Sequence, residues 1–278
     1  MSKFKLNKAL NRKQVVIFVS LEGGVLKSTS ADKLVSKLRQ KGFKVAFWDA
    51  DPSNKYSNYK KNKTKDAKGN IIDDDQFTGC IKLDLKKEAA KIVNASDVEA
   101  DFVVIDLPAN KAEESVSGLK SISEFILSFT DDLSNSDVVF SIPISNDKCV
   151  RTFNTVYSWT KGIDEEEMVH PIKIVSIINT GFMGDNEASL EKTMNLYEKD
   201  QFIELMKNDS RFNFKEVEMK GSFDDSGLMK DLLEVTNLGD AMSNLNNHAT
   251  NIRRMLNKHN ADAENLIEQY LDNPIVEE

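Results

Sequence analysis

The chain has few of the residues that build disulfide frameworks and metal centres. Its 278 residues include two cysteines, Cys80 and Cys149, which lie far apart and lack the spacing of metal ligands. Such sparse cysteines are typical of reduced thiols in a cytoplasmic protein. The three histidines, His170, His248 and His259, form no catalytic or metal-binding pattern. The composition therefore favours neither a secreted disulfide scaffold nor a zinc enzyme.

Long hydrophobic runs are also missing. No stretch approaches the roughly 18 apolar residues that a membrane span needs. The N-terminus lacks the apolar core of a secretory signal peptide, and low-complexity repeats are absent. The length lies within the range of one domain. We expect a cytoplasmic protein with a basic arm over residues 1–13 and a single domain over 14–278, ending in a helical tail over about 228–271.

Basic residues are concentrated at the start of the chain. Residues 1–65 contain 16 Lys and Arg but only 4 Asp and Glu, although the whole chain carries a formal net charge of −8. Many of these lysines lie in residues 1–13 and 55–68. They indicate either a polyanion site, since phosphate neutralisation needs only clustered positive charge, or a solvated arm and loop.

Apolar runs alternate with helical patterns along the chain. Because buried parallel strands read as continuous apolar runs, the alternation predicts an α/β fold, with a mostly parallel twisted sheet and helices on both faces. The strand-like runs are residues 15–19, 45–48, 102–105, 136–143 and 172–178. The helical patterns cover residues 31–38, 111–135, 186–208 and the tail.

The first apolar run leads into a glycine loop. Gly23 and Gly24 are followed by Lys27, Ser28 and Thr29, where the helical pattern begins. This order of strand, loop and helix directs backbone N–H groups at phosphates. Lys27 would neutralise phosphate charge, Ser28 would offer its hydroxyl to Mg²⁺, and Thr29 would line the phosphates. The alternative is a strand–turn–helix connection without a ligand.

Three later runs end in polar residues. The second run is followed by Asp49 and Asp51, the third by Asp106, and the fifth by Asn179. Side chains at the carboxyl ends of parallel strands point into the ligand crevice of an α/β sheet. For Asp51 and Asn179 an ordinary turn is the alternative, since both residue types favour turns.

In order and spacing, these motifs resemble the ParA/MinD family of P-loop ATPases over roughly residues 13–245. The resemblance implies a site for ATP or ADP with Mg²⁺. Asp51 would orient the attacking water and Lys27 would assist catalysis. The Mg²⁺ shell would include Ser28, Asp49 and Asp106. The implied nucleotide contacts are Gly23, Gly24, Val25, Leu26, Lys27, Ser28, Thr29 and, at the adenine base, Asn179.

Two residues depart from the family pattern. Glu22 stands where the signature lysine would reach across a dimer to the partner's phosphates, and it reverses that charge. Leu26 stands where a third glycine would give the backbone its freedom. Hydrolysis therefore stays open between a weak, detuned ATPase and a protein that binds nucleotide without turnover.

The C-terminal region distinguishes two branches of the family. The end of the tail, residues 263–272, is acidic, whereas MinD-like proteins end in a basic helix that docks on anionic lipid. The ParA branch binds DNA nonspecifically, and Arg253, Arg254 and Lys258 lie at helical spacing in the corresponding region. We therefore expect no membrane partner.

The expected role is DNA or plasmid partition by an ATP-dependent homodimer. It would involve nonspecific DNA, a partition or transfer partner protein, and a cytoplasmic or nucleoid-associated location. The alternative is a non-hydrolysing adaptor in DNA segregation or conjugative transfer. A metabolic P-loop enzyme is a third interpretation, for which no substrate pocket can be identified in the sequence.

Overall fold

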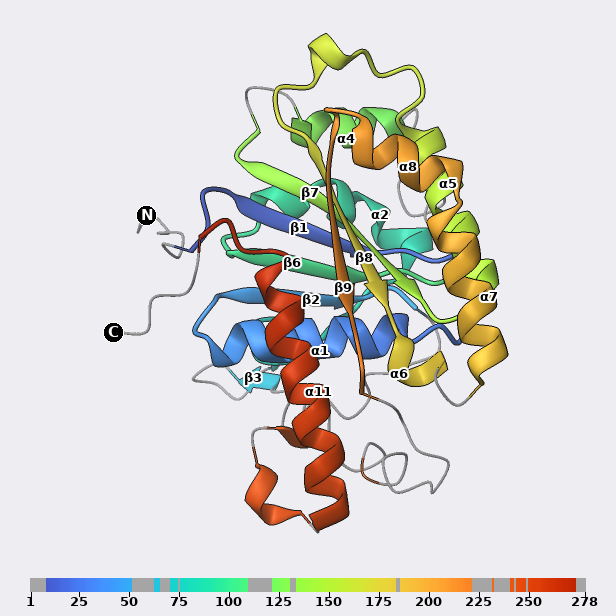
Figure 1. Ribbon diagram of the computed structural model, residues 1–278. Helices are drawn as coiled ribbons and strands as arrows, with labels where there is room; N and C mark the ends of the chain where they lie inside the picture. The colour runs from blue at the N-terminus through green and yellow to red at the C-terminus, as the bar shows by residue number, and fades with distance from the viewer. Residues whose placement is uncertain are drawn as a thin grey trace.

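The computed structural model describes residues 9–51, 63–65, 71–74, 76–109, 122–130, 134–183, 186–221, 232, 241–242, 244–248 and 250–273. Seven strands form one sheet in the order β5-β2-β6-β1-β7-β8-β9, and every pair in it is parallel (Figure 1). A two-stranded antiparallel hairpin, β3-β4, lies outside this sheet. The predicted α/β class, with a mostly parallel sheet, is confirmed.

The strands are β1 (Lys13–Phe18), β2 (Val45–Asp49), β3 (Lys63–Lys65), β4 (Ile71–Asp74), β5 (Ile81–Lys82), β6 (Phe102–Asp106), β7 (Ser136–Ile144), β8 (Ile172–Ile178) and β9 (Phe212–Glu218). All five apolar runs are strands, and they form the five central strands of the sheet. The two outermost strands, β5 and β9, were not predicted. β5 has only two residues, and β9 mixes polar and apolar residues because it is partly exposed at the sheet edge.

The helices are α1 (Lys27–Gln40), α2 (Leu85–Val93), α4 (Ile122–Thr130), α5 (Arg151–Trp159), α6 (Thr180–Met183), α7 (Glu187–Glu198), α8 (Gln201–Asn208) and α11 (Thr250–Glu268). Short 3₁₀ helices are η1 (Ala95–Asp97), η2 (Asp147–Val150), η3 (Glu165–Glu167) and η4 (Leu245–Asn247). No helix in the described part of the chain has the length and apolar character of a membrane span.

One expected helix differs from the structure, and parts of other expected segments are not described by it. The single helix expected over 186–208 is two helices, because Asp200 caps a new helix by accepting hydrogen bonds from the N–H groups of Phe202 and Ile203. Residues 1–8 of the expected arm, residues 55–62 and 66–68 of the second lysine cluster, and most of 228–249 lie outside the described residues. Within the described chain Arg12 is ion-paired with Asp137 at 2.6 Å.

Two apolar cores lie on opposite faces of the sheet. Successive side chains of each strand point into opposite cores. On β2, Trp48 packs into one core and Phe47 into the other. Helices α2, α4, α5, α7 and α8 cover the Trp48 face, whereas α1 and α11 cover the Phe47 face (Figure 1). Helix α1 therefore lies on the Phe47 side of the sheet, whereas Val25 of the glycine loop packs into the Trp48 core.

A buried ion pair joins α1 to α11. Lys33 Nζ lies 3.0 Å from Asp262 Oδ2, and their side chains are only 3% and 4% exposed. The same carboxylate accepts hydrogen bonds from the backbone N–H groups of Lys220 (2.8 Å) and Gly221 (2.9 Å), just beyond β9. Gly221 leaves room for this contact, since a Cβ there would lie 2.5 Å from His259 Nδ1. Asp262 thus connects α1, α11 and the end of β9.

The C-terminal end of the described chain is attached to the sheet. The buried Tyr270 hydroxyl lies 2.7 Å from Ser141 Oγ on β7, and Gln14 of β1 donates to the Tyr270 carbonyl at 2.5 Å. Lys173 on β8 pairs with Asp272 at 2.9 Å. These contacts hold the second half of α11 against the strands while its first half extends past α1 (Figure 1).

We expect Asp262→Ala to lower the free energy of unfolding by about 3–5 kcal/mol. The change leaves the Lys33 ammonium buried without this partner and removes the acceptor of two backbone N–H groups. Urea denaturation measures the loss. Glu264→Ala is the matched control, because this ion pair with Lys37 (2.6 Å) is partly exposed and should contribute about 1 kcal/mol or less. Equal losses in the two variants would contradict the assignment.

Candidate functional site

The glycine loop lies between β1 and α1 and has a left-handed backbone at two positions. Gly24 has φ 72° and Leu26, the residue before α1, has φ 60°. Leu26 is the one residue other than glycine with positive φ in the described chain. Left-handed conformations cost an L side chain about 1–2 kcal/mol. The loop thus keeps a glycine-like backbone at Leu26 although the residue there is leucine.

Neighbouring strand ends hold the loop in place. The Val25 carbonyl accepts a hydrogen bond from Ser145 Oγ (2.8 Å), directly after β7. Asn179, directly after β8, donates from its amide to Ser145 Oγ and to the Ile177 carbonyl, each at 3.4 Å. Asn179 is buried and connects to the loop through Ser145. Sequence reasoning missed Ser145, although a polar residue directly after an apolar strand run was the available signal.

Two α1 residues converge on one carboxylate. Lys27 Nζ forms an ion pair with Asp106 Oδ1, and Ser28 Oγ donates to Asp106 Oδ2 at 2.6 Å. Asp106 is fully buried at the end of β6, and Lys27 is nearly so. Three residues that the sequence predicted for one site, about 80 positions apart in the chain, are therefore in direct contact.

A second carboxylate lies beside this cluster. Asp49 ends β2 in register with Asp106 on β6, so both point to the α1 face. Burial raises the pKa of Asp49 from its ordinary value of 3.8 to about 7, and the negative charge of Asp106 adds to this rise. The N–H of Asp51 donates to Asp49 Oδ1 at 2.9 Å and opposes the rise. Asp51 itself is buried next to this pair.

The donor set suits a magnesium nucleotide. Carboxylate and hydroxyl oxygens from Asp49, Asp106 and Ser28 are hard ligands of the kind that Mg²⁺ prefers. The described residues hold no group of three or more His, Cys, Asp or Glu that could bind a metal alone. Mg²⁺ binds through one or two carboxylates and takes its other oxygens from water and phosphate. A Cβ added at Gly23 or Gly24 would meet nothing within 4 Å, so space beside the loop is open.

The remaining predicted residues lie in different places. Thr29 is half-buried in the first turn of α1. Glu22 is half-buried at the start of the loop, where its N–H donates to Ser20 Oγ and its carbonyl accepts from the same hydroxyl. Its carboxylate reinforces the effect of burial in raising the pKa of the Cys149 thiol. Glu22 therefore places negative charge next to η2.

The three basic residues predicted to bind DNA are separate from the loop. Arg254 and Lys258 are exposed on the first half of α11, and Arg253 is half-buried and donates to Thr250 Oγ1 at 3.2 Å. Among the contacts that the structure describes, none joins them to the glycine loop. They lie on the same helix as Asp262, which contacts α1.

A parallel sheet, a glycine loop before a Lys-Ser-Thr helix start, and aspartates at two neighbouring strand ends together define a P-loop nucleotide-binding protein. Over residues 16–274 the chain matches the family described as the CobQ/CobB/MinD/ParA nucleotide binding domain. The chain belongs to this family, as its motifs predicted.

The chain is also similar to several solved structures. A complex of McdA from Cyanothece with ATP is 14% identical, with 96% of this chain and 99% of that chain covered and a TM-score of 0.50. MinD with Mg-ADP from Pyrococcus horikoshii OT3 is 16% identical, with 92% of this chain and 97% of that chain covered and a TM-score of 0.48. A plasmid partition protein from Borrelia burgdorferi is 17% identical, with 81% of this chain and 98% of that chain covered and a TM-score of 0.44. The McdA likeness shows the fold alone. No curated protein matches the chain.

We expect Leu26→Gly to raise the free energy of unfolding by about 1 kcal/mol. Glycine adopts the positive φ at this position without strain, and its greater freedom in the unfolded chain offsets part of the gain. Thermal or urea denaturation measures the change. Leu26→Ala is the control, because alanine keeps the Cβ and the strain. A gain in stability with alanine as large as that with glycine would refute this account.

The raised pKa of Asp49 predicts that stability falls as pH rises from about 4 to about 7. In this window the folded state keeps a proton that the unfolded state has lost, so each step up in pH favours unfolding. Asp49→Asn removes this titration. The free energy of unfolding of the variant minus that of the native chain should therefore be larger at pH 8 than at pH 4.5, by on the order of 1–4 kcal/mol. Urea denaturation across this range measures it.

The control for this pH dependence is Glu198→Gln, which changes an exposed carboxyl on α7. Its stability should follow that of the native protein at every pH. If Asp49→Asn also followed the native curve in parallel, burial of Asp49 would not be the source of the pH dependence.

Proposed function

We propose that the chain binds ATP and ADP with Mg²⁺ at the glycine loop and acts as a ParA-like protein in the partition or stability of plasmid or other DNA. The observation that carries the nucleotide part is the convergence of Lys27 and Ser28 on the buried Asp106 beside Asp49. The family supports the same assignment, because its members are described as nucleotide-binding domains.

Each residue then has a role that its position supports. Lys27 would exchange its contact with Asp106 for phosphate oxygens, and the N–H groups of residues 23–29 would donate to the phosphates. Ser28, Asp49 and Asp106 would hold Mg²⁺, which when bound neutralises charge that builds up on the phosphates. Asp51 would orient the attacking water, and Asn179 would contact the base.

The basic residues of α11 support the DNA part of the proposal. Exposed positive charge at Arg254 and Lys258, with Arg253 beside them, suits nonspecific contact with DNA phosphates. An ATP-bound homodimer would present two such helices, and a partition or transfer protein would respond to the dimer. In this role the protein would act in the cytoplasm on the nucleoid.

Glu22 supports a second candidate, a ParA-like adaptor that does not hydrolyse nucleotide and whose fold persists with or without it. A carboxylate at the start of the loop repels phosphate oxygens where the family pattern has a lysine, and Leu26 adds backbone strain to the same loop. In that form the protein would serve as a structural subunit in DNA segregation or conjugative transfer. Its partner binding would then be independent of turnover.

We expect Lys27→Ala to weaken Mg·ATP binding at least tenfold, measured by isothermal titration calorimetry. The loss of one charge-assisted contact with phosphate accounts for a tenfold to hundredfold change. Lys161→Ala, which removes an exposed lysine far along the chain, is the control and should bind as the native protein does. The absence of nucleotide binding by the native chain would contradict the proposed nucleotide site and the ATPase form of the proposal.

Turnover assays with and without DNA separate the two candidates. DNA-stimulated hydrolysis by the native protein supports the partition ATPase. If only Glu22→Lys hydrolyses ATP, and Glu22→Gln does not, the native loop lacks the positive charge that turnover requires. The adaptor then stands, and Lys27→Ala should leave its partner binding unchanged.

A further inference from the structure

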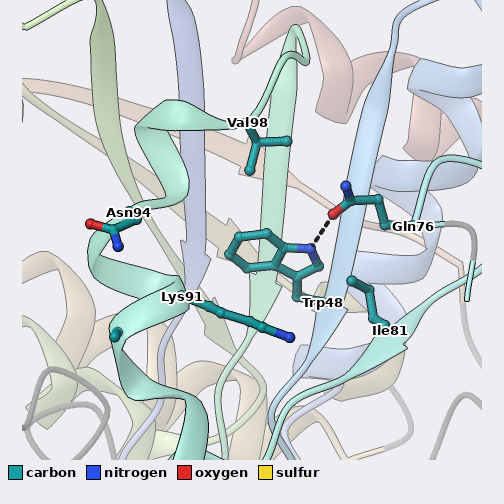
Figure 2. A pocket seen from close by; sticks show the side chains of 7 residues that line it. Trp48, Gln76, Ile81, Lys91, Asn94 and Val98 are labelled. Carbon is teal, nitrogen blue, oxygen red and sulfur yellow. Dashed lines mark hydrogen bonds between the residues drawn. The ribbon is translucent and has the colours of Figure 1, made fainter. Parts of the chain in front are cut away.

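A concave site lies on the face of the sheet opposite α1. It is a cavity of about 410 Å³ that opens between β2, β5, α2 and η1 (Figure 2). Trp48 forms part of its wall, and the next residue on the strand is Asp49, whose side chain points to the other face. The cavity is therefore separate from the candidate nucleotide site, although both lie along β2. Its volume falls within the usual range of small-molecule pockets.

The apolar wall of the cavity is built around an oriented indole. Trp48 Nε1 donates a hydrogen bond to Gln76 Oε1 at 2.8 Å, which fixes the direction of the ring (Figure 2). Val98 and Ile81 lie on either side of the indole, and Ala90 from α2 completes the wall. Trp48 is only 4% exposed, so a small part of the indole faces the cavity, and a ligand would reach it together with the aliphatic side chains. Such a wall favours a small apolar group.

The polar side chains of the lining all carry hydrogen-bond donors. Lys91 contributes an ammonium, and Asn94 and Gln76 contribute amide NH₂ groups. Gln76 uses its carbonyl oxygen for the indole, which leaves its amide nitrogen as the donor. The Asn94 side chain makes no capping hydrogen bond to η1, the 3₁₀ helix that it precedes. Among the described residues, no carboxylate lines the cavity.

Lys91 has donor capacity for a further anion. Its ammonium pairs with Glu88 at 2.6 Å, and the two side chains are 54% and 31% exposed, so the pair is weak and solvated. An ammonium has three N–H donors, of which Glu88 takes one. In Figure 2 the Lys91 side chain extends along the cavity beside the indole toward Ile81. A carboxylate held there would complement the ammonium.

We propose that this cavity binds a small aromatic carboxylate, with its ring against the apolar wall beside Trp48 and its anionic group near Lys91. The proposal is independent of nucleotide binding. A test probe is 3-phenylpropionate, with 3-phenylpropanamide as the uncharged counterpart of the same shape. For a ligand of about 11 heavy atoms, usual ligand efficiencies give a dissociation constant on the order of millimolar.

The chain has two tryptophans, so its indole N–H groups give an internal control. Trp48 lines the cavity. Trp159, on α5, is buried against Phe140 of β7 and is not part of the cavity wall. In ¹H–¹⁵N spectra the two indole N–H signals are assigned from the signal that Trp48→Phe removes. Addition of 3-phenylpropionate should shift the Trp48 signal saturably and leave the Trp159 signal in place. The amide should bind at least about threefold more weakly, as expected for loss of an exposed ion pair.

Two variants locate the site. Ala90→Leu fills the exposed mouth without disturbing helix propensity and should abolish the Trp48 shift. Lys91→Met keeps the length of the side chain, removes its charge, and should reduce affinity for the acid to that for the amide. Lys87→Met is the matched control: this lysine is on the same helix, its side chain is 81% exposed and it is not part of the lining, so binding should be unchanged.

Three results would overturn the proposal. The first is the absence of a saturable Trp48 shift up to about ten times the expected dissociation constant. The second is equal affinity for the acid and the amide, which would remove the role of Lys91. The third is unchanged binding in Ala90→Leu, which would place the ligand elsewhere. This result counts if the unfolding midpoint of the variant matches that of the native protein.

Discussion

The buried Asp106 carboxylate is the constraint on which the site depends. A charge without solvent is stable only when it is paired and hydrogen-bonded, and Lys27 and Ser28 provide both contacts. Because these two residues open α1 and Asp106 ends β6, the carboxylate fixes the start of the helix relative to the centre of the sheet. The preceding glycine loop must then close a short connection, and Leu26 adopts positive φ to do so.

Charge within this site is balanced closely. Lys27 compensates Asp106, but Asp49 lies in register on the neighbouring strand, buried, and its pKa rises. A divalent cation would relieve this crowding of carboxylates, since it favours the ionised form of both. The burial and closeness of Asp49 and Asp106 are unfavourable without a cation, and the same two properties suit the pair to Mg²⁺.

The structure connects this site to two more distant regions by different means. On the α1 face, Lys33 and Asp262 form a buried contact between the helix after the loop and the helix that carries Arg253 and its basic neighbours. On the other face, β2 places Trp48 in the wall of a separate cavity one residue before Asp49. Sheet alternation keeps the two sites apart, although one strand serves both.

The sequence by itself determined the five central strands and the polar residues at their ends. Buried parallel strands are continuous apolar runs, and their carboxyl ends meet along one edge, so the sequence alone was enough to place Asp49 and Asp106 together. The edge strands β5 and β9 were missed because partial exposure removes the apolar signal. Only the tertiary structure decided the Lys33–Asp262 pair and the Trp48 cavity, since both depend on which distant elements pack against each other.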